Sequence, residues 1–201
     1  MADPIDDLIH RYGFVTASAL AEALGVSRQA AHGRLAAAVE AGRLRPEGNA
    51  RARRYLPIVP CFSFDVAGLV EDRVLAHVRA RLETDFRSLS AAEDRVLAYV
   101  FTEMVNNAIE HAHAARVSVS LEIRKDAVAL AVVDDGIGAF ASVQAGRGLA
   151  SPMEAAAEIT KGKVTTMPEH HSGEGVFFSS KAVDRFEMEA NGVALVVDNS
   201  I

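Results

Sequence analysis

Three short stretches of the sequence hold residues whose types and spacing suit a ligand that carries phosphate. Gly173 and Gly175, in "HHSGEGVFF", open a predicted helix, where free backbone amides and the helix dipole attract phosphate. Asp134 begins "DDGIG" at the end of a predicted strand, and Gly136 and Gly138 let the backbone approach a ligand closely there. Each of these motifs is common by itself.

The third stretch is "TEMVNNAIEHA", residues 102–112, which places carboxylates and amides on a segment otherwise apolar enough to be a core helix. Glu103 and Asn107 lie four residues apart, so their side chains leave the same face of a helix. In this order and with this spacing, the three stretches together are a strong signal for a ligand site.

The elements that must position these residues follow from hydrophobic periodicity and turn signals. A strand is expected over 61–66, long helices over 67–86 and 88–114, a hairpin over 115–135, a helix over 173–184 and a second hairpin over 185–200. Ser90 is the expected N-cap of the second helix, and Asn191–Gly192 is the expected turn of the last hairpin. Helices that cover one face of such a sheet make an α+β sandwich.

The first 57 residues differ from this pattern. Three short amphipathic segments, 4–13, 16–25 and 27–42, predict a helix-turn-helix, and Gly25 suits the tight turn between the second and third helices. Two extended stretches with arginines follow, so we predict a winged helix-turn-helix over 1–58 and a second domain over 59–201. The segment 56–61, "LPIVPC", is the expected linker.

The winged helix indicates a DNA-binding module. The start of its third helix would present side chains to base edges, and its other arginines would meet phosphates. The residues expected at DNA are Ser27, Arg28, Gln29, Arg34, Arg51, Arg53 and Arg54. Residues 1–57 carry 8 basic and 6 acidic side chains, whereas the whole chain has a net charge of −6. Docking of a protein and dimerisation remain open as alternatives.

The sequence has neither a signal peptide nor an apolar run long enough to span a membrane, so we expect a soluble, cytoplasmic protein. Cys61 is the single cysteine, which excludes an intrachain disulfide. Symmetric dimers are the commonest soluble oligomers, and we expect a homodimer.

The three stretches resemble the boxes of the Bergerat-fold ATP-binding domain of the GHKL superfamily, which includes gyrase-type topoisomerases, heat-shock chaperones, histidine kinases and anti-sigma serine kinases. The resemblance covers roughly residues 62–199. It implies an α/β sandwich with helices on one face of a mixed, mainly antiparallel sheet, and it implies ATP and Mg²⁺ as cofactors. Residues 140–172 match the mobile lid of this superfamily, with a short helix from Pro152.

The resemblance also implies roles for individual residues. Glu103 would be the base that orients or deprotonates the nucleophile, Asn107 would hold Mg²⁺, and His111 would lie near phosphate. Asp134 would accept a hydrogen bond from the adenine amino group, with Gly136 and Gly138 shaping that wall. The amides of Gly173 and Gly175 would wrap the triphosphate, and Lys163 would reach the phosphates from the lid.

The order of the two domains looks like a bacterial subgroup in which a STAS-like domain follows the ATPase domain, and we expect a shortened member without that third domain. We interpret the chain as an ATP-binding regulatory protein, a transcription regulator in which Mg-ATP binding controls a winged helix on duplex DNA. The alternative is an anti-sigma-type serine/threonine protein kinase that docks a regulatory protein partner through its winged helix. A third interpretation is a non-catalytic interaction module.

Overall fold

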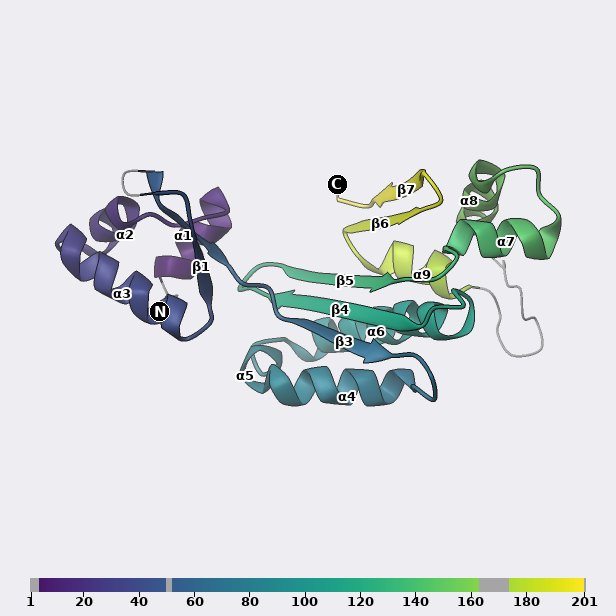
Figure 1. Cartoon of the computed structure of the whole chain (residues 1–201), viewed down its shortest axis with the longest axis horizontal. Coiled ribbons are helices and arrows are strands. Elements are labelled where there is room, and N and C mark those ends of the chain that lie inside the picture. Colours follow the sequence, from purple (N-terminus) through teal and green to yellow (C-terminus); the bar gives the residue numbers. More distant parts are fainter. Residues whose placement is uncertain (1–3, 50–51, 163–173, 201) are drawn as a thin grey trace. The chain divides into compact units, whose positions relative to one another are not determined.

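The computed structural model describes residues 4–49, 52–162 and 174–200, and the chain divides into two compact units, residues 1–60 and 61–201 (Figure 1). Each unit has its own apolar core. The units are therefore described separately.

The N-terminal unit holds three helices followed by an antiparallel hairpin. They are α1 (Pro4–Tyr12), α2 (Ala17–Leu24), α3 (Arg28–Glu40), β1 (Leu44–Glu47) and β2 (Arg54–Pro57). Thr16 and Ser27 cap α2 and α3 with their hydroxyl oxygens, and Gly25 takes a left-handed conformation, φ 64°, between them. Val15 pairs with Tyr55 and ties the segment before α2 to the hairpin. Leu20, Ala31 and Leu35 are fully buried in its core.

The C-terminal unit consists of helices and antiparallel strands. Its elements are β3 (Cys61–Asp65), α4 (Glu71–Arg81), α5 (Glu83–Phe86), α6 (Ala91–Glu110), β4 (Arg116–Ile123), β5 (Val128–Asp134), α7 (Ala139–Arg147), α8 (Pro152–Thr160), α9 (Gly175–Ala182), β6 (Arg185–Ala190) and β7 (Val193–Asp198).

The strands β3, β4 and β5 form one antiparallel sheet in that order, and α4 and α6 pack on one face of it (Figure 1). Val74, Phe101 and Val119 are fully buried between these layers. Ser90 begins α6 with a capping box in which Glu93 accepts a hydrogen bond from the Ser90 backbone N–H. The start of α6 is therefore fixed by residues next to it in the sequence.

Two predicted segments differ from the structure in their length. The helix expected over 67–86 begins at Glu71 and breaks at Leu82, where the backbone leaves the helical region and allows Phe86 to be buried beneath Arg79. The linker expected over 56–61 is only 58–60, because β2 extends to Pro57 and β3 begins at Cys61.

The expected α+β class with mainly antiparallel pairing is confirmed, since every described strand pair is antiparallel. The prediction of one mixed sheet is wrong, because β6 and β7 form a two-stranded sheet of their own. The hairpin packs on α7 and α8 instead, in a cluster that includes Phe140, Ile159 and Met188. Within the segment 140–172, expected as a mobile lid, α7 and α8 bury apolar side chains, and residues 163–172 lie outside the described residues, so its mobility stays a prediction. The helix expected from Pro152 is confirmed as α8.

Candidate functional site

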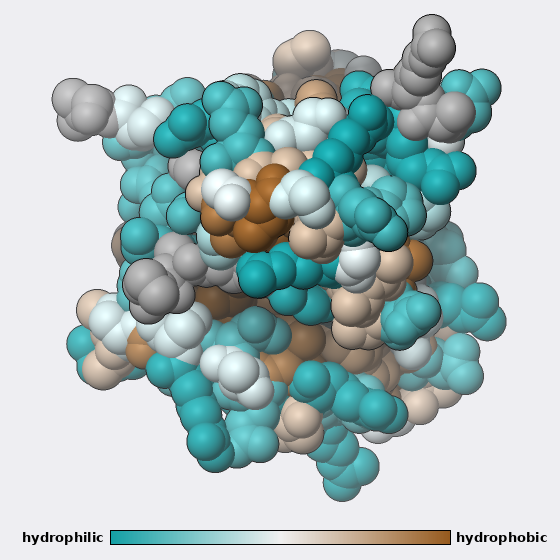
Figure 2. Space-filling view, turned by 90° about the vertical axis from the view of Figure 1, so that its left-hand side faces the viewer, coloured by the Kyte–Doolittle hydropathy of each residue, from teal (hydrophilic) through white to brown (hydrophobic). Residues whose placement is uncertain are grey.

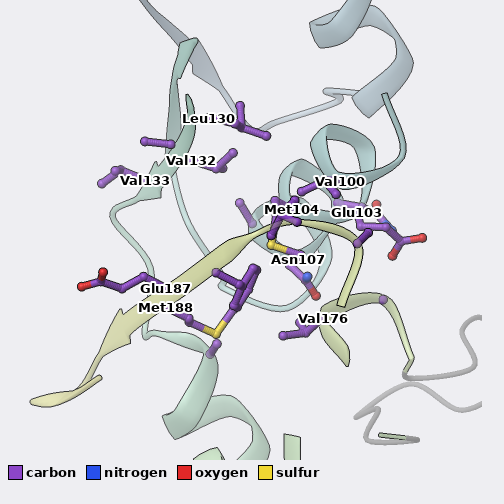
Figure 3. A pocket seen from close by; sticks show the side chains of 18 of the residues that line it. Val100, Glu103, Met104, Asn107, Leu130, Val132, Val133, Val176, Glu187 and Met188 are labelled. Carbon is purple, nitrogen blue, oxygen red and sulfur yellow. The ribbon is translucent and has the colours of Figure 1, made fainter. Parts of the chain in front are cut away.

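A cleft of about 1480 Å³ lies between α6, β5, α9 and β6 (Figure 3). Met104 and Asn107 of α6 and Met188 of β6 turn toward the same space. Predicted site residues from all three stretches line this cleft: Glu103, Asn107, His111, Asp134, Gly136, Gly138 and Gly175. Lys163 and Gly173 fall outside the described residues.

Glu103 and Asn107 lie one turn apart on α6, and the start of α9 meets them. A Cβ added to Gly175 would lie 3.0 Å from the Glu103 Cδ atom and closer still to the carboxylate oxygen Oε2. Gly175 is the first residue of α9, so its end of the helix carries backbone N–H groups that the helix leaves without internal partners. A carboxylate, an amide and a helix N-terminus therefore come together at one point of the cleft.

Asn106 and Glu110 form a second polar pair on α6. Asn106 Nδ2 donates a hydrogen bond to Glu110 Oε2 at 3.2 Å, one turn further along α6. The two pairs of side chains therefore have different contacts. Glu103 and Asn107 face the start of α9, whereas Asn106 and Glu110 satisfy each other.

Tyr99 lies one turn before Glu103 and also lines the cleft. Burial, followed by the nearby carboxylates of Glu103 and Glu174, raises the pKa of the Tyr99 phenol. A phenol is protonated near neutral pH even without this shift, so Tyr99 presents a neutral hydroxyl beside these acidic groups. The sequence did not predict Tyr99 as a site residue.

The two adjacent aspartates of "DDGIG" have different positions. Asp134 lines the cleft, and its Oδ1 accepts a hydrogen bond from the Gly136 backbone N–H at 2.9 Å. Asp135 accepts hydrogen bonds from the Arg116 and Ala115 backbone N–H groups, and these bonds hold the pKa of Asp135 below its ordinary value. Asp135 thus fastens the start of β4, whereas Asp134 is the one of the two that lines the cleft.

Gly136 is required by a close approach of two backbone segments. A Cβ there would lie 2.7 Å from the Ala112 carbonyl carbon and closer still to its oxygen, which accepts a hydrogen bond from the Ile137 N–H at 2.8 Å. This contact fixes the end of β5 against the end of α6. His111, the C-cap residue of α6, lies beside the same junction.

Asn191 is a residue of the site region that the sequence suggested only as a turn. It and Gly192 have positive φ values of 53° and 74°, as the hairpin turn predicts. Its side chain donates to the Ile137 carbonyl at 2.9 Å and accepts from the Ala141 N–H at 3.0 Å. Asn191 thereby joins the tip of the β6–β7 hairpin to the first turn of α7, beside Gly138.

In the N-terminal unit, the predicted DNA contacts lie on α3 and the hairpin. Arg28, Gln29 and Arg34 are exposed on α3, and Arg53 is exposed before β2. Ser27 uses its hydroxyl oxygen to accept a hydrogen bond from the Ala30 N–H. The hydroxyl keeps its proton and one lone pair for the predicted contact with a base.

Of the other two arginines predicted at DNA, Arg54 has contacts within the unit. Arg54 stacks over the Phe14 ring at 5.1 Å from its centroid and pairs with Glu47 at 3.6 Å. Arg51 falls outside the described residues. Figure 2 shows the left-hand side of Figure 1, where α2 and α3 lie. Hydrophilic side chains predominate on that face.

The model of the histidine kinase-like ATPase domain family matches residues 70–198. The match covers more than half of the chain, and the chain belongs to this family. A search of curated proteins and a search of solved structures each gave no match.

The residues of the cleft fit the ATP and Mg²⁺ that this family implies. Mg²⁺ is usually held by one or two side-chain oxygens together with substrate phosphates, and Glu103 and Asn107 offer a carboxylate and an amide oxygen. Among the described residues, no three His, Cys, Asp or Glu side chains form a metal-binding group, so phosphate oxygens would have to complete the set. Gly175 leaves room for the Glu103 carboxylate beside the start of α9 because it carries no Cβ. In the parts of the chain that the structure describes, no helix has the length and apolar character that a membrane span requires.

Proposed function

We propose that this chain is a regulatory protein in which Mg-ATP bound in the cleft controls the binding of duplex DNA by the N-terminal unit. The observation that carries the ATP-binding part is the meeting of Glu103, Asn107 and Gly175 at one point of the cleft, with Asp134 on its wall. In this proposal, Asn107 holds Mg²⁺ and the first turn of α9 receives phosphate. Asp134 accepts a hydrogen bond from the adenine amino group.

The DNA-binding part assigns the N-terminal unit as a winged helix-turn-helix. The order of its helices and hairpin, the left-handed Gly25 and the exposed Arg28 and Gln29 at the start of α3 support this assignment. Arg34 and Arg53 would contact phosphates. Control by ATP requires that Mg-ATP bind one arrangement of the protein more tightly than the other, since a ligand shifts an equilibrium only by its differential affinity.

A second candidate is a serine or threonine protein kinase of the anti-sigma type. The Glu103 carboxylate lies at the proposed phosphate end of the cleft, where it would orient or deprotonate a hydroxyl of a partner protein for attack on the γ-phosphate. Glu103→Ala would then abolish transfer while ATP binding stays nearly intact. Loss of affinity in the same variant would show that Glu103 holds the nucleotide instead.

Isothermal titration of Mg-ATP into Asp134→Asn tests the pocket, and Asp135→Asn is the matched control. We expect Asp134→Asn to lose adenine-nucleotide binding, because its amide can present a donor where adenine also donates. Asp135→Asn should keep the affinity of the wild type. Equal affinity in all three proteins would remove the adenine-site assignment.

Binding to arbitrary duplex DNA, measured as a function of salt with and without Mg-ATP, tests the second half of the proposal. Neutralised phosphates release counterions, so the affinity should fall steeply as salt rises. Arg28→Ala and Arg34→Ala should weaken binding, whereas Arg81→Ala, on α4 of the other unit, should not. Equal DNA affinity of the wild type and all three variants would contradict the assignment of α3 as the helix that contacts DNA.

A further inference from the structure

A second cavity lies within the N-terminal unit, where residues from the start of α2, the start of α3 and the β1–β2 hairpin line it. Its volume is about 710 Å³. Small-molecule pockets usually measure about 300–1,000 Å³. A DNA duplex is read by side chains that enter its grooves. The hollow itself therefore suits a smaller ligand.

The walls of this cavity are fixed to one another. Val15, just before α2, and Tyr55 of β2 exchange two backbone hydrogen bonds of 2.9 Å, and both residues are buried. The Thr16 hydroxyl oxygen caps α2 by accepting a hydrogen bond from the Ala19 N–H. The His32 ring of α3 meets the Tyr55 ring edge-on, with 6.3 Å between the two centroids. A ligand would therefore find the cavity already formed.

The lining of this cavity is positively charged. Among the described residues it includes three arginines, Arg28, Arg53 and Arg54, and one carboxylate, Glu47. Arg54 and Glu47 pair with each other at 3.6 Å, so the net positive charge comes from Arg28 and Arg53. Arg28 is the first residue of α3 and Arg53 lies just before β2, and both are exposed. Guanidinium groups pair with carboxylates and phosphates, so the lining favours an anion.

Other parts of the lining are apolar. Phe14, which is half-buried, and Tyr55 bring aromatic rings to the cavity. The Arg54 guanidinium lies over the Phe14 ring at 5.1 Å from its centroid. Ala17 and Ser18 also line the cavity, and the N–H groups at such a helix start have no partners within the helix. A ligand that matches this lining combines an anionic group with a small apolar body.

We propose that this cavity binds a small organic anion, in which a carboxylate or a phosphate monoester is joined to a flat apolar body. The anionic group lies beside Arg28 and Arg53, and the apolar body lies against Phe14. Because Arg28 and Arg53 are also expected at DNA, the bound anion competes with duplex DNA for them. This competition rests on the proposed function, whereas the anion site itself does not.

An NMR titration of the isotope-labelled full chain tests the site. The probes are benzoate and phenyl phosphate, and benzamide, which has the same ring without the charge, is the matched control ligand. We expect saturable shifts of the Ala17, Ser18 and Arg28 backbone N–H signals with at least one of the two anions, and none with benzamide. Arg28→Ala combined with Arg53→Ala should weaken the binding roughly twofold to thirtyfold, the range for two exposed ion pairs. Arg45→Ala, at an exposed position on β1 that does not line the cavity, should keep the affinity of the wild type.

Competition with DNA is measured separately. The affinity for duplex DNA is compared in the anion that binds and in chloride at equal ionic strength, because salt alone weakens DNA binding. We expect a lower affinity in the anion. Equal affinity in the two salts would overturn the competition.

Three results of the NMR titration would overturn the anion site. The absence of saturable shifts with both anions would mean that the cavity takes no such ligand. Equal shifts with benzamide would mean that the cavity does not recognise the charge, and equal affinity of the double variant would mean that Arg28 and Arg53 do not hold the anion. The titration contains neither DNA nor ATP, so its failure is distinguishable from failure of the proposed function.

Discussion

Replacement of Gly136 by alanine tests the contact that holds the end of β5 against α6. The new Cβ would lie 2.7 Å from the Ala112 carbonyl carbon and 2.8 Å from the Ala112 Cβ, whereas ordinary contacts begin at 3.4 Å. Because the Ala112 carbonyl belongs to the backbone, no side chain can turn aside, and one segment must move. Overpacking costs about 1–3 kcal/mol. Weakening the hydrogen bond from Ile137 to Ala112 adds about 1 kcal/mol.

We therefore expect Gly136→Ala to lower the free energy of unfolding by about 2–4 kcal/mol, which at a urea dependence of about 1–3 kcal/mol/M moves the midpoint down by roughly 0.7–4 M. The chain has no Trp, so the transition is followed by far-UV circular dichroism. Gly175→Ala is the matched control, because its Cβ meets the movable end of the Glu103 side chain. A midpoint for Gly136→Ala equal to that of the wild type would refute the reasoning.

Three further predictions concern α9 and the start of β4. Gly175→Ala should leave stability nearly unchanged but displace the Glu103 carboxylate. With Glu103 as the base that we propose for the kinase, a misplacement of about 1 Å would cost about a hundredfold in turnover, measured as phosphate transfer. Ser179 is fully buried, and its hydroxyl has no hydrogen-bond partner within the described residues, so Ser179→Ala should raise the free energy of unfolding by about 1 kcal/mol; Ser180→Ala, which removes a hydroxyl that donates to a carbonyl, should bring no gain. The hydrogen bonds that lower the pKa of Asp135 stabilise the folded state fully above the ordinary pKa of 3.8. This stability is lost as the pH falls through the lowered pKa of the folded state. Asp135→Asn should therefore make the free energy of unfolding depend less on pH below about pH 4.

Features that depend on neighbouring residues could be predicted from the sequence. Ser90 begins α6 because its hydroxyl and the Glu93 carboxylate satisfy backbone groups within one turn. Asn191 and Gly192 turn the last hairpin because both accept positive φ. Glu103 and Asn107 share a face because helix geometry alone requires it. Each of these interactions spans only a few residues.

Features that depend on distant residues could not be predicted in this way. Asp134 and Asp135 are identical in type, and only the pairing of β4 with β5 decides which of them faces the cleft. The segment that forms α7 has only two large apolar residues, Phe140 and Val143. Phe140 and Met188, 48 positions apart in the sequence, pack in one cluster. Periodicity within the segment carries no sign of that partner.

The β6–β7 hairpin borders both the proposed nucleotide end of the cleft and its apolar part, which Val100 and Leu130 line. The buried clusters on the two sides of the cleft have no residue in common, so the hairpin and β5 are not held together by a shared core. Asn191 at one end of the hairpin and Asn199 at the other hold it by hydrogen bonds to α7 and α9. Apolar side chains of β5 that a continuous sheet would flank therefore stay accessible, and Val133 is 64% exposed. Exposed apolar surface of this kind favours association with other molecules.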